Sequence, residues 1–449
     1  MIDPSQFQDK KMALYTLGCR LNFAETSTIA TQLKTMGFRK IKMGEKADIC
    51  IINTCTVTEL ADKKSRQAIQ RLIRQHPHAF VVVTGCYAQL KPQDIAEIKG
   101  VDLVLGANEK FNVTSYLDSL NKKTEAQIKH VDTAQIQRFR PSLSHDDRTR
   151  FFLKVQDGCD YHCSYCTIPM ARGASRNGSI NDTLRWAHQA LSEGAKEIVL
   201  TGVNIGDFGK STHETFIDLL KALDDIPNKI RYRIGSIEPN LLTDQIIDFV
   251  SRSAHFTPHF HIPLQSGSNA MLKLMRRRYQ RELFKEKVEM IRQCIPDAFI
   301  GVDVIVGMHG ETAEEFENGY EFIQQLPISQ LHVFTFSERA NTAALSIENP
   351  VSMADRKKRS DRLHQLSNEK LKTFYLLHQG ERRDVLWESN RKGKMMTGFT
   401  DNYIHVAMPW DKTKLNQFEN VLLENFNDTL TENGWMGFQC ETKDSMTTK

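Results

Sequence analysis

The chain has 449 residues, 40% of them hydrophobic, and a formal net charge of +4 at pH 7. This length allows about three domains, and this hydrophobic fraction is ordinary for a globular protein with buried cores. The N-terminus lacks the apolar stretch of a signal peptide, and no segment approaches the ~18 apolar residues of a membrane span, so we expect a cytoplasmic protein.

The chain contains nine cysteines, and their number bears on the kind of site that it can form. Disulfides are rare in cytosolic proteins, so grouped cysteines are interpreted as metal ligands or catalytic thiols. The mild positive charge permits a nucleic-acid partner but does not require one, because local clustering of charge matters more than the sum.

The first segment, residues 10–122, alternates short apolar runs with polar stretches that have apolar residues at helical spacing. The apolar runs lie at 12–17, 49–52, 80–83 and 101–105. This βαβ rhythm predicts a doubly wound parallel sheet. Residues 123–144 are polar and aperiodic, and this composition predicts a linker.

A second series of alternating strand and helix candidates occupies residues 145–374. Its candidate strands lie at 152–155, 197–200, 232–234, 259–262, 299–306 and 331–336. Six such units predict a complete or partial parallel βα barrel. The tail, 377–440, has short β-prone runs broken by Gly, Asn and Asp, which favours a small β-barrel. The predicted fold class is therefore α/β with a small C-terminal β-barrel.

Three cysteines follow the first candidate strand of the second series. Cys159, Cys163 and Cys166 have C-x3-C-x2-C spacing, and three thiolates this close together can bind three corners of one 4Fe-4S cluster. No fourth cysteine is near, so one iron stays open for a small chelating cofactor. The alternatives are a zinc knuckle, with His162 as the fourth ligand, or buried thiols.

Three further cysteines each follow a candidate strand of the first domain. These residues are Cys19, Cys55 and Cys86. Ligands of open α/β sheets bind outside the carboxyl ends of the strands, so residues distant in sequence can meet at one point. That geometry suits a second cluster with three protein ligands. The alternative is three core thiols like Cys50, which lies in mid-strand.

The C-x3-C-x2-C spacing is the signature of the radical S-adenosylmethionine (SAM) superfamily, and nearly the whole chain resembles its methylthiotransferase family. The segments that carry the resemblance are TLGCRLNFAET, INTCTVTELADKKSRQ, TGCYAQ, KVQDGCDYHCSYCTIPMARGASR and HIPLQSGSNAMLKLMRR. The resemblance implies two 4Fe-4S clusters and SAM as cofactors. It also implies that one cluster generates a 5′-deoxyadenosyl radical from SAM, while the auxiliary cluster supplies sulfur that another SAM methylates. The tail resembles TRAM, an RNA-binding barrel.

The resemblance extends to residues that would hold SAM, most of them at strand ends of the second series. These residues are Tyr165, Gly202, Asn204, Ser236, Glu238, Gln265, Asp303 and Ile305. Because the strand ends of a parallel barrel face one site, these positions can converge, although a glycine turn or a capping serine is the alternative. Arg172 and Arg176 follow the cysteine loop and are candidates to bind a threonylcarbamoyl carboxylate or a phosphate through the arginine fork.

Members of the family act on isopentenyladenosine in tRNA, on threonylcarbamoyladenosine in tRNA or on a ribosomal protein aspartate. The motifs at 19–22 (Cys-Arg-Leu-Asn) and 53–58 (Asn-Thr-Cys-Thr-Val-Thr) resemble the threonylcarbamoyladenosine branch most. The product expected from this resemblance is the 2-methylthio derivative, made on the adenosine next to the anticodon. The alternatives are the other two substrates, or a two-cluster electron-transfer protein.

Local basic segments support a tRNA anticodon loop as the partner. Residues 355–374 carry seven Lys/Arg against three Asp/Glu, and 276–281 and 62–74 are also basic; a solvated helix face is the alternative for each. The tail has seven Lys/Arg against nine Asp/Glu, with its basic residues at Arg382–Arg383 and 391–394, where a local patch can form. We further expect an electron donor of the flavodoxin or ferredoxin type, no membrane partner and a monomer.

Overall fold

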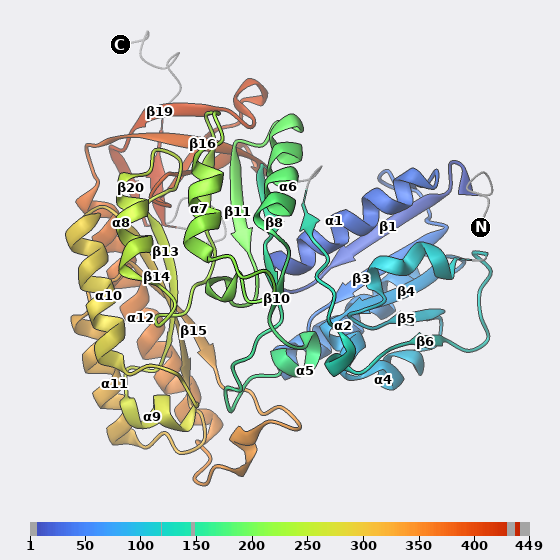
Figure 1. The fold of residues 1–449 in the computed structure, drawn as a ribbon, viewed down its shortest axis with the longest axis horizontal. Coiled ribbons are helices and arrows are strands. Elements are labelled where there is room, and N and C mark those ends of the chain that lie inside the picture. Colours follow the sequence, from blue (N-terminus) through green and yellow to red (C-terminus); the bar gives the residue numbers. More distant parts are fainter. Residues whose placement is uncertain (1–6, 118, 145–148, 429–435, 441–449) are drawn as a thin grey trace.

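The computed structural model describes residues 7–117, 119–144, 149–428 and 436–440. Figure 1 shows an N-terminal sheet domain beside a larger central domain, with a small C-terminal sheet packed over one end of the central strands. This architecture confirms the predicted α/β class. None of the helices within those ranges combines the length and the apolar character that a membrane crossing requires.

The N-terminal domain contains a six-stranded parallel sheet in the order β2-β1-β3-β4-β5-β6. Its strands are β1 (Lys11–Thr16), β2 (Arg39–Lys40), β3 (Ile49–Thr54), β4 (Phe80–Gly85), β5 (Leu103–Leu105) and β6 (Gln127–Lys129). Side chains alternate between the two faces of a strand. Ile49 and Ile51 therefore share a core with α1 (Arg20–Thr35), whereas Cys50 and Ile52 share the opposite core with α2 (Glu59–Gln75). The sheet is thus doubly wound, and Cys50 is a core thiol.

The segment predicted as a linker, 123–144, contains two short strands. β6 extends the N-terminal sheet, with Leu103 opposite Gln127, and β7 (Ser142–Leu143) pairs antiparallel with the first strand of the central domain. Strands of two or three residues are too short to show an alternating pattern. Their pairing partners, which the sequence does not reveal, determine their conformation.

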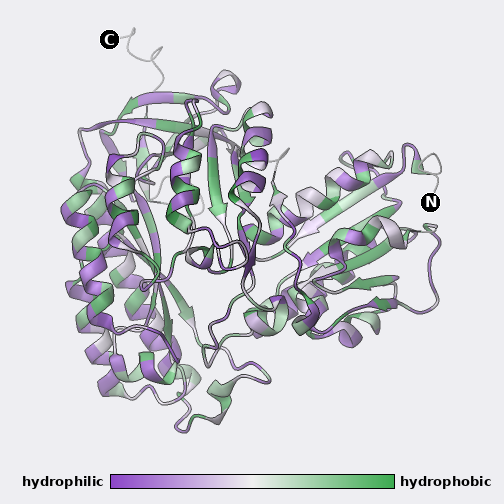
Figure 2. Cartoon of the chain, in the orientation of Figure 1, coloured by the Kyte–Doolittle hydropathy of each residue, from purple (hydrophilic) through white to green (hydrophobic). Residues whose placement is uncertain are grey.

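The central domain is a partial barrel of six parallel strands, as predicted. They are β8 (Arg150–Lys154), β11 (Glu197–Thr201), β12 (Arg231–Ile234), β13 (His259–Gln265), β14 (Phe299–Val306) and β15 (Gln330–Thr335). Only isolated parallel bridges join β12 to the β13 region. The outer helices are α6 (Ile180–Ser192), α7 (Phe216–Asp224), α8 (Asp244–Arg252), α10 (Arg281–Cys294), α11 (Ala313–Gln325) and α12 (Met353–Leu377). Figure 2 shows hydrophobic residues concentrated on the strands and on one side of the helices.

The open side of the barrel is covered by the other two domains. Ala24 of α1 packs against Phe152 and Val199, whose side chains face away from the main core of the barrel helices. At the opposite end, Tyr403 of the C-terminal domain contacts Phe299 and His259. The inner side of the barrel, called the lumen below, therefore contacts residues of both other domains.

The C-terminal domain is a curled six-stranded sheet in the order β19-β16-β17-β18-β21-β20. The strands are β16 (Arg382–Lys392), β17 (Met395–Thr400), β18 (His405–Pro409), β19 (Phe418–Leu422), β20 (Asn425–Asn427) and β21 (Gly437–Gln439). Trp387, Val406 and Phe438 form its core together with Phe374 and Tyr375 of α12. The sheet is consistent with the predicted TRAM-like domain.

Candidate functional site

The first site is the loop that carries Cys159, Cys163 and Cys166, beyond the carboxyl end of β8. Gly158 has a φ of +72°, and a Cβ there would lie 2.0 Å from the Ala174 carbonyl oxygen. Only glycine therefore allows this close approach of the two chain segments. The Cys159 N–H donates to the Gly173 carbonyl oxygen at 3.0 Å. The loop is thereby held in one conformation before any ligand binds.

The three thiols of this loop lie close enough to interact electrostatically. Burial raises the pKa of Cys159 and of Cys166 to about 12, and it also raises that of Cys163. The Cys159 and Cys166 sulfurs accept N–H bonds from Tyr161 and Ile168, each at 3.4 Å. Thiols in this environment ionise when a metal supplies the compensating positive charge.

The spacing of the sulfurs distinguishes a cluster from a single ion. Zinc binds thiolates at about 2.3 Å, so three sulfurs on one zinc ion lie within about 4.6 Å of one another. Among the described residues, neither cysteine set brings three sulfurs within 4.8 Å of one another. This separation disfavours the zinc knuckle and fits a cluster in which each cysteine binds a different iron.

Arg277 is a site residue that the sequence analysis missed. Its side chain is buried and donates to the Cys163 sulfur at 3.1 Å and to the Tyr165 hydroxyl at 3.4 Å, and it forms an ion pair with Glu238. Burial raises the pKa of Glu238 to about 7, although Arg277 opposes this shift. Three consecutive arginines are typical of an exposed basic patch, and only the fold shows that the middle one turns inward.

One pocket adjoins the cysteine loop, with a volume of about 240 Å³. Four predicted SAM-binding residues line it, namely Tyr165, Gln265, Asp303 and Ile305, together with Cys166. Gln265 has a φ of +68° beside an irregularity in the β13–β14 pairing. Val57 and Thr58 of the N-terminal domain line the same pocket. The pocket is therefore formed by both domains.

The remaining predicted SAM-binding residues lie at the ends of β11 and β12, outside that pocket. A Cβ on Gly202 would lie 2.8 Å from Ile205 Cγ2 and 2.9 Å from Gln156 Oε1. The buried Oδ1 of Asn204 has no hydrogen-bond partner among the described residues, and such an atom suits a ligand donor. Ser236 bridges to His261 of β13, whereas Glu238 follows the same strand as the partner of Arg277.

The second site brings Cys19, Cys55 and Cys86 together from three parts of the N-terminal sheet. A Cβ on Gly18 would lie 2.8 Å from Cys55 Cβ and 3.0 Å from its sulfur, so a glycine beside Cys19 allows the two cysteines to approach. The Cys55 thiol interacts electrostatically with those of Cys86 and Cys19, and burial raises its pKa to about 11. Cys19 is exposed and Cys86 is buried. The strand-end geometry expected for a second cluster is therefore present.

A buried network of charges underlies this second site and joins the two domains. Glu25 of α1 pairs with Lys110, Lys154 and Arg172, at 2.6, 2.9 and 3.1 Å. Asp157 pairs with Lys154, Arg172 and Arg176, at 2.6, 2.9 and 3.0 Å. The network thus contains four cationic side chains and two carboxylates. Burial opposes ionisation of Glu25, yet Arg172, Lys110 and Lys154 hold its pKa well below the usual range.

The network changes the interpretation of Arg172 and Arg176, which were predicted to contact substrate. Both side chains are buried. Arg172 also donates to Asn22 at 2.7 Å, and Arg176 donates to the carbonyl oxygens of Arg172 and Ala174. Their terminal N–H groups donate to protein partners, whereas the buried Nε of Arg176 has no partner among the described residues. These contacts favour a role in positioning the two domains at their boundary.

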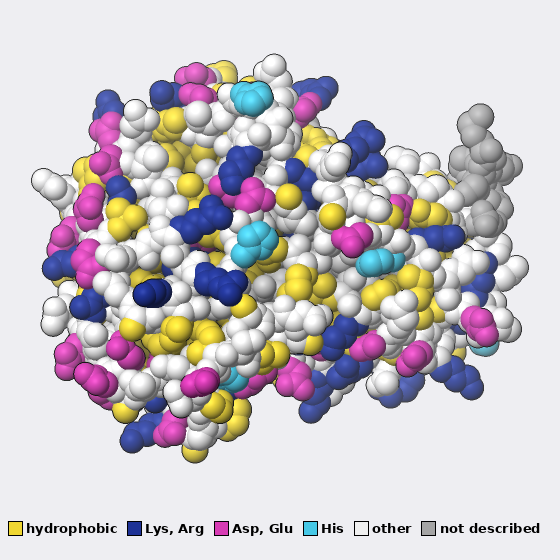
Figure 3. Space-filling view, turned by 60° about the horizontal axis from the view of Figure 1, so that its bottom comes forward, with side chains coloured by type: hydrophobic (Ala, Val, Ile, Leu, Met, Phe, Trp, Pro, Cys, Tyr) yellow, Lys and Arg dark blue, Asp and Glu magenta, His cyan; other side chains and the backbone are white. Residues whose placement is uncertain are grey.

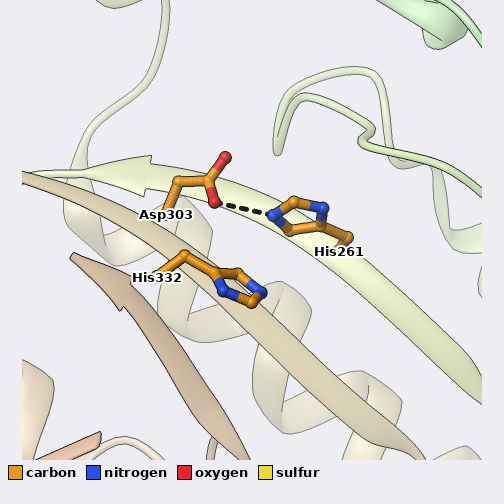
Figure 4. A group of neighbouring side chains, drawn as sticks. All are labelled: His261, Asp303 and His332. Carbon is orange, nitrogen blue, oxygen red and sulfur yellow. Dashed lines mark hydrogen bonds and ion pairs between the residues drawn. The ribbon is translucent and has the colours of Figure 1, made fainter. Parts of the chain in front are cut away.

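Three polar side chains from the adjacent strands β13, β14 and β15 lie side by side, as Figure 4 shows: His261, Asp303 and His332. His261 Nε2 lies 2.7 Å from Asp303 Oδ1, and one ligand atom from each residue lies within 4.8 Å of the others. Burial lowers the pKa of His332. The lumen wall beneath the pocket is therefore polar.

The basic segments differ in how many of their cations are available to RNA. In α12, Arg359 and Arg362 pair with Glu311 and Glu317, and Arg356 is buried. In the C-terminal domain, Arg383 pairs with Asp297 and Glu381, and the predicted patch at 391–394 includes Arg391 and Lys392, whose side chains lie outside the described residues.

Exposed cations also surround the mouth of the site. Lys63, Lys64 and Arg66 are exposed on α2, and Arg276 and Arg278 are exposed beside the cysteine loop. Arg278 lies over the Tyr161 ring at 4.0 Å. Figure 3, with the lower end of the molecule turned forward, shows Lys and Arg side chains spread over both domains of this face. This face offers positive charge to an anionic partner, and so do Lys357 and Lys358, which are exposed on α12.

The family models that match the chain are the "Uncharacterized protein family UPF0004" at residues 11–106 and the "Radical SAM superfamily" at residues 153–323. The "Threonylcarbamoyladenosine tRNA methylthiotransferase MtaB" of Bacillus subtilis (strain 168) is 38% identical, over 88% of this chain and 90% of its own length. The protein of that name from Aquifex aeolicus (strain VF5) is 36% identical, over 88% and 96%.

Two further comparisons bear on the substrate and on the fold. The "tRNA-2-methylthio-N(6)-dimethylallyladenosine synthase" of Clostridium botulinum (strain Langeland / NCTC 10281 / Type F) is 29% identical, over 92% of this chain and 94% of its own length. Among solved structures, the radical SAM methyltransferase TsrM of Kitasatospora setae, with cobalamin and a 4Fe-4S cluster bound, matches with a TM-score of 0.53 at 15% identity. That match covers 73% of this chain and 75% of the other, and it shows a shared fold.

Proposed function

This chain belongs to the radical SAM methylthiotransferases, in the branch of the threonylcarbamoyladenosine tRNA enzymes, and from that premise we propose which residues perform the reaction. The enzyme converts N6-threonylcarbamoyladenosine next to the tRNA anticodon into its 2-methylthio derivative. SAM and an iron–sulfur cluster are its cofactors. We further propose a second cluster at Cys19, Cys55 and Cys86.

The pocket shared by the two domains carries this proposal. Cys166 of the first site lines it, and so do Val57 and Thr58, which closely follow Cys55 of the second site. A substrate atom in this pocket is therefore within reach of both cysteine sets. When bound, the cofactors would remove a hydrogen atom from the substrate and supply a methylated sulfur. Both changes occur at the same carbon of the adenine, so both cysteine sets must be close to it.

Residues of this chain bind and orient the reactants. Tyr165, Gln265, Asp303 and Ile305 form the wall that receives SAM, and Arg277 orients the Cys163 sulfur through its N–H bond. Arg172 fixes the two domains relative to each other through Glu25 and Asp157. These contacts keep the two sites at a constant separation, as sequential chemistry on one substrate requires.

We propose that tRNA binds across the face that carries Lys63, Lys64, Arg66, Arg276 and Arg278. Their charges neutralise phosphates of the anticodon arm. The target base must leave its stack to enter the pocket, which a loop permits at low cost. We also propose that the protein is a cytoplasmic monomer and that it receives electrons from a donor of the flavodoxin or ferredoxin type.

Mass spectrometry of nucleosides tests the substrate directly. tRNA is taken from a host that lacks this activity, with the intact gene, with its Cys159→Ala variant and without the gene. We expect threonylcarbamoyladenosine to gain a methylthio group only with the intact gene. A change in isopentenyladenosine alone would overturn the branch assignment, and no change in any nucleoside would overturn the tRNA substrate.

A further inference from the structure

Arg20 is the first residue of α1 and directly follows Cys19. Residues four apart lie on the same face of a helix, so Arg20 shares a face with Ala24, which packs on Phe152 and Val199 of the barrel. The Arg20 guanidinium lies 5.9 Å from the centre of the Phe152 ring. This arginine of the N-terminal domain thus projects into the lumen of the central domain.

The surroundings of Arg20 confirm this placement. It interacts electrostatically with Arg150, Arg233, His259 and His332 of four barrel strands, with Glu197 of a fifth, and with Tyr403 of the C-terminal domain. Residues from opposite walls of the barrel are within reach of one guanidinium only if that guanidinium is inside. Arg20 is therefore a charge at the centre of the enclosed space, beside the second cysteine site.

Arg20 differs from the other lumen arginines in having no carboxylate partner. Arg150 pairs with Glu388 at 2.7 Å, and Arg233 pairs with Glu197 at 2.9 Å. Arg20 has neither an ion pair nor a hydrogen bond with any residue in the described part of the chain. The carboxylate that acts electrostatically on Arg20 is Glu197 of β11, and its two oxygens already accept hydrogen bonds from Arg233, at 2.9 and 3.1 Å. A buried cation without a carboxylate of its own is costly, and a bound anion reduces that cost.

The proposed substrate has an anion that fits. Its threonylcarbamoyl group ends in a carboxylate and also carries a hydroxyl and ureido N–H groups, whereas an isopentenyl group has no polar atom. We propose that Arg20 binds the threonyl carboxylate through its two-pronged guanidinium and is the residue that selects threonylcarbamoyladenosine. This inference rests on the proposed function and names the contact that determines its substrate.

The opposite wall of the lumen suits the rest of the group. His261, Asp303 and His332 provide both donors and acceptors for a hydroxyl and for N–H groups, and His332 makes no hydrogen bond with any of the described residues.

A substrate that differs by one charge tests the proposal. Anticodon stem-loop RNA is prepared with threonylcarbamoyladenosine as the free acid and as its methyl ester, which keeps the size and removes the charge. We expect the wild-type enzyme to prefer the acid about 10- to 100-fold in kcat/KM, the range of a charge-assisted hydrogen bond. Arg20→Met should react with acid and ester equally, and Arg20→Lys should fall between, since lysine keeps the charge without the fork.

Matched controls separate this inference from the proposed function. Arg185→Met removes an exposed arginine of the outer helix α6 and should keep the wild-type preference. Binding of both RNAs to the cluster-free protein, followed by fluorescence anisotropy, should show the same loss of preference in Arg20→Met. An unchanged acid-to-ester ratio in Arg20→Met would overturn the role of Arg20 while the methylthiotransferase function stands. Wild-type enzyme that modifies neither RNA, yet binds the acid more tightly, would instead overturn the proposed function.

Discussion

The two cysteine sites differ in how the chain assembles them and in the charges around them. Cys159, Cys163 and Cys166 lie on one loop, next to the Arg277–Glu238 ion pair. The second site requires three strand ends of one sheet, and it lies over a buried network with an excess of cations. One site thus depends on local chain geometry, and the other depends on the whole N-terminal domain and its contact with the barrel.

The largest expected effect comes from removing one complete set of cysteines. The triple variant Cys159→Ala, Cys163→Ala, Cys166→Ala should lose all 5′-deoxyadenosine formation from SAM, because the SAM-binding iron is gone. The triple variant Cys19→Ala, Cys55→Ala, Cys86→Ala should retain that activity and lose only the methylthio product. Each should lose about four irons, measured by elemental analysis. Unchanged iron in the second variant would show that the auxiliary site holds no cluster.

Glu25→Gln tests whether the buried charge network between the two domains stabilises the protein. It leaves Lys110, Lys154 and Arg172 without their shared carboxylate, and breaking such a buried pair costs about 3–5 kcal/mol. Urea unfolding of the cluster-free protein measures this loss. Asp248→Asn, which breaks an exposed pair with Arg252, is the control and should change stability by less than about 1 kcal/mol. Equal effects of the two substitutions would show that the network does not stabilise the interface.

Arg277→Met tests the local electrostatics of the first site. Residues that hydrogen-bond to metal ligands commonly contribute 10- to 100-fold to affinity or activity. We expect 5′-deoxyadenosine formation without RNA to fall by about that factor. Lys273→Met removes an exposed cation on the neighbouring helix α9 (Asn269–Leu274) and should have no effect. Equal rates in the two variants would remove Arg277 from the site.

The smallest expected effect is a pH dependence due to Glu238. Its pKa is about 7 in the folded protein against an ordinary value of 4.5, so the folded state binds this proton more tightly than the unfolded chain does. The contribution of Glu238 to the free energy of unfolding is therefore largest below pH 4.5 and is lost as the pH rises through 7. The Glu238→Gln protein has no group that titrates at this position, so its free energy of unfolding does not fall for this reason.

The Glu238→Gln protein should therefore exceed the wild type in stability at pH 8. The expected gain is about 1–2 kcal/mol, because the lost ion pair with Arg277 offsets part of the shift. At pH 4.5 the gain should disappear. Urea unfolding of the cluster-free proteins at both pH values measures it, and a difference independent of pH would contradict titration of Glu238 in this range.

Much of the fold was predictable because its signals are local. Alternating side chains and amphipathic helices indicated the six barrel strands and the doubly wound sheet, and the spacing of Cys159, Cys163 and Cys166 indicated a cluster loop. The use of individual charges was not predictable. In the basic segment 355–374, Arg359 and Arg362 neutralise carboxylates of the barrel, whereas Lys357 and Lys358 are exposed, and a sequence does not show which charges pair.

The sequence by itself determined the chemistry of the ligands, because cysteine spacing and strand-end placement are properties of the chain. Only the tertiary structure decided which side chains meet. Arg172 forms a buried contact between domains, Arg277 donates a hydrogen bond to Cys163, and the Arg20 side chain of the N-terminal domain lies against the inner side of the barrel. Each outcome depends on packing between elements distant in sequence, where burial and pairing of charge, and not residue type, determine what a side chain can bind.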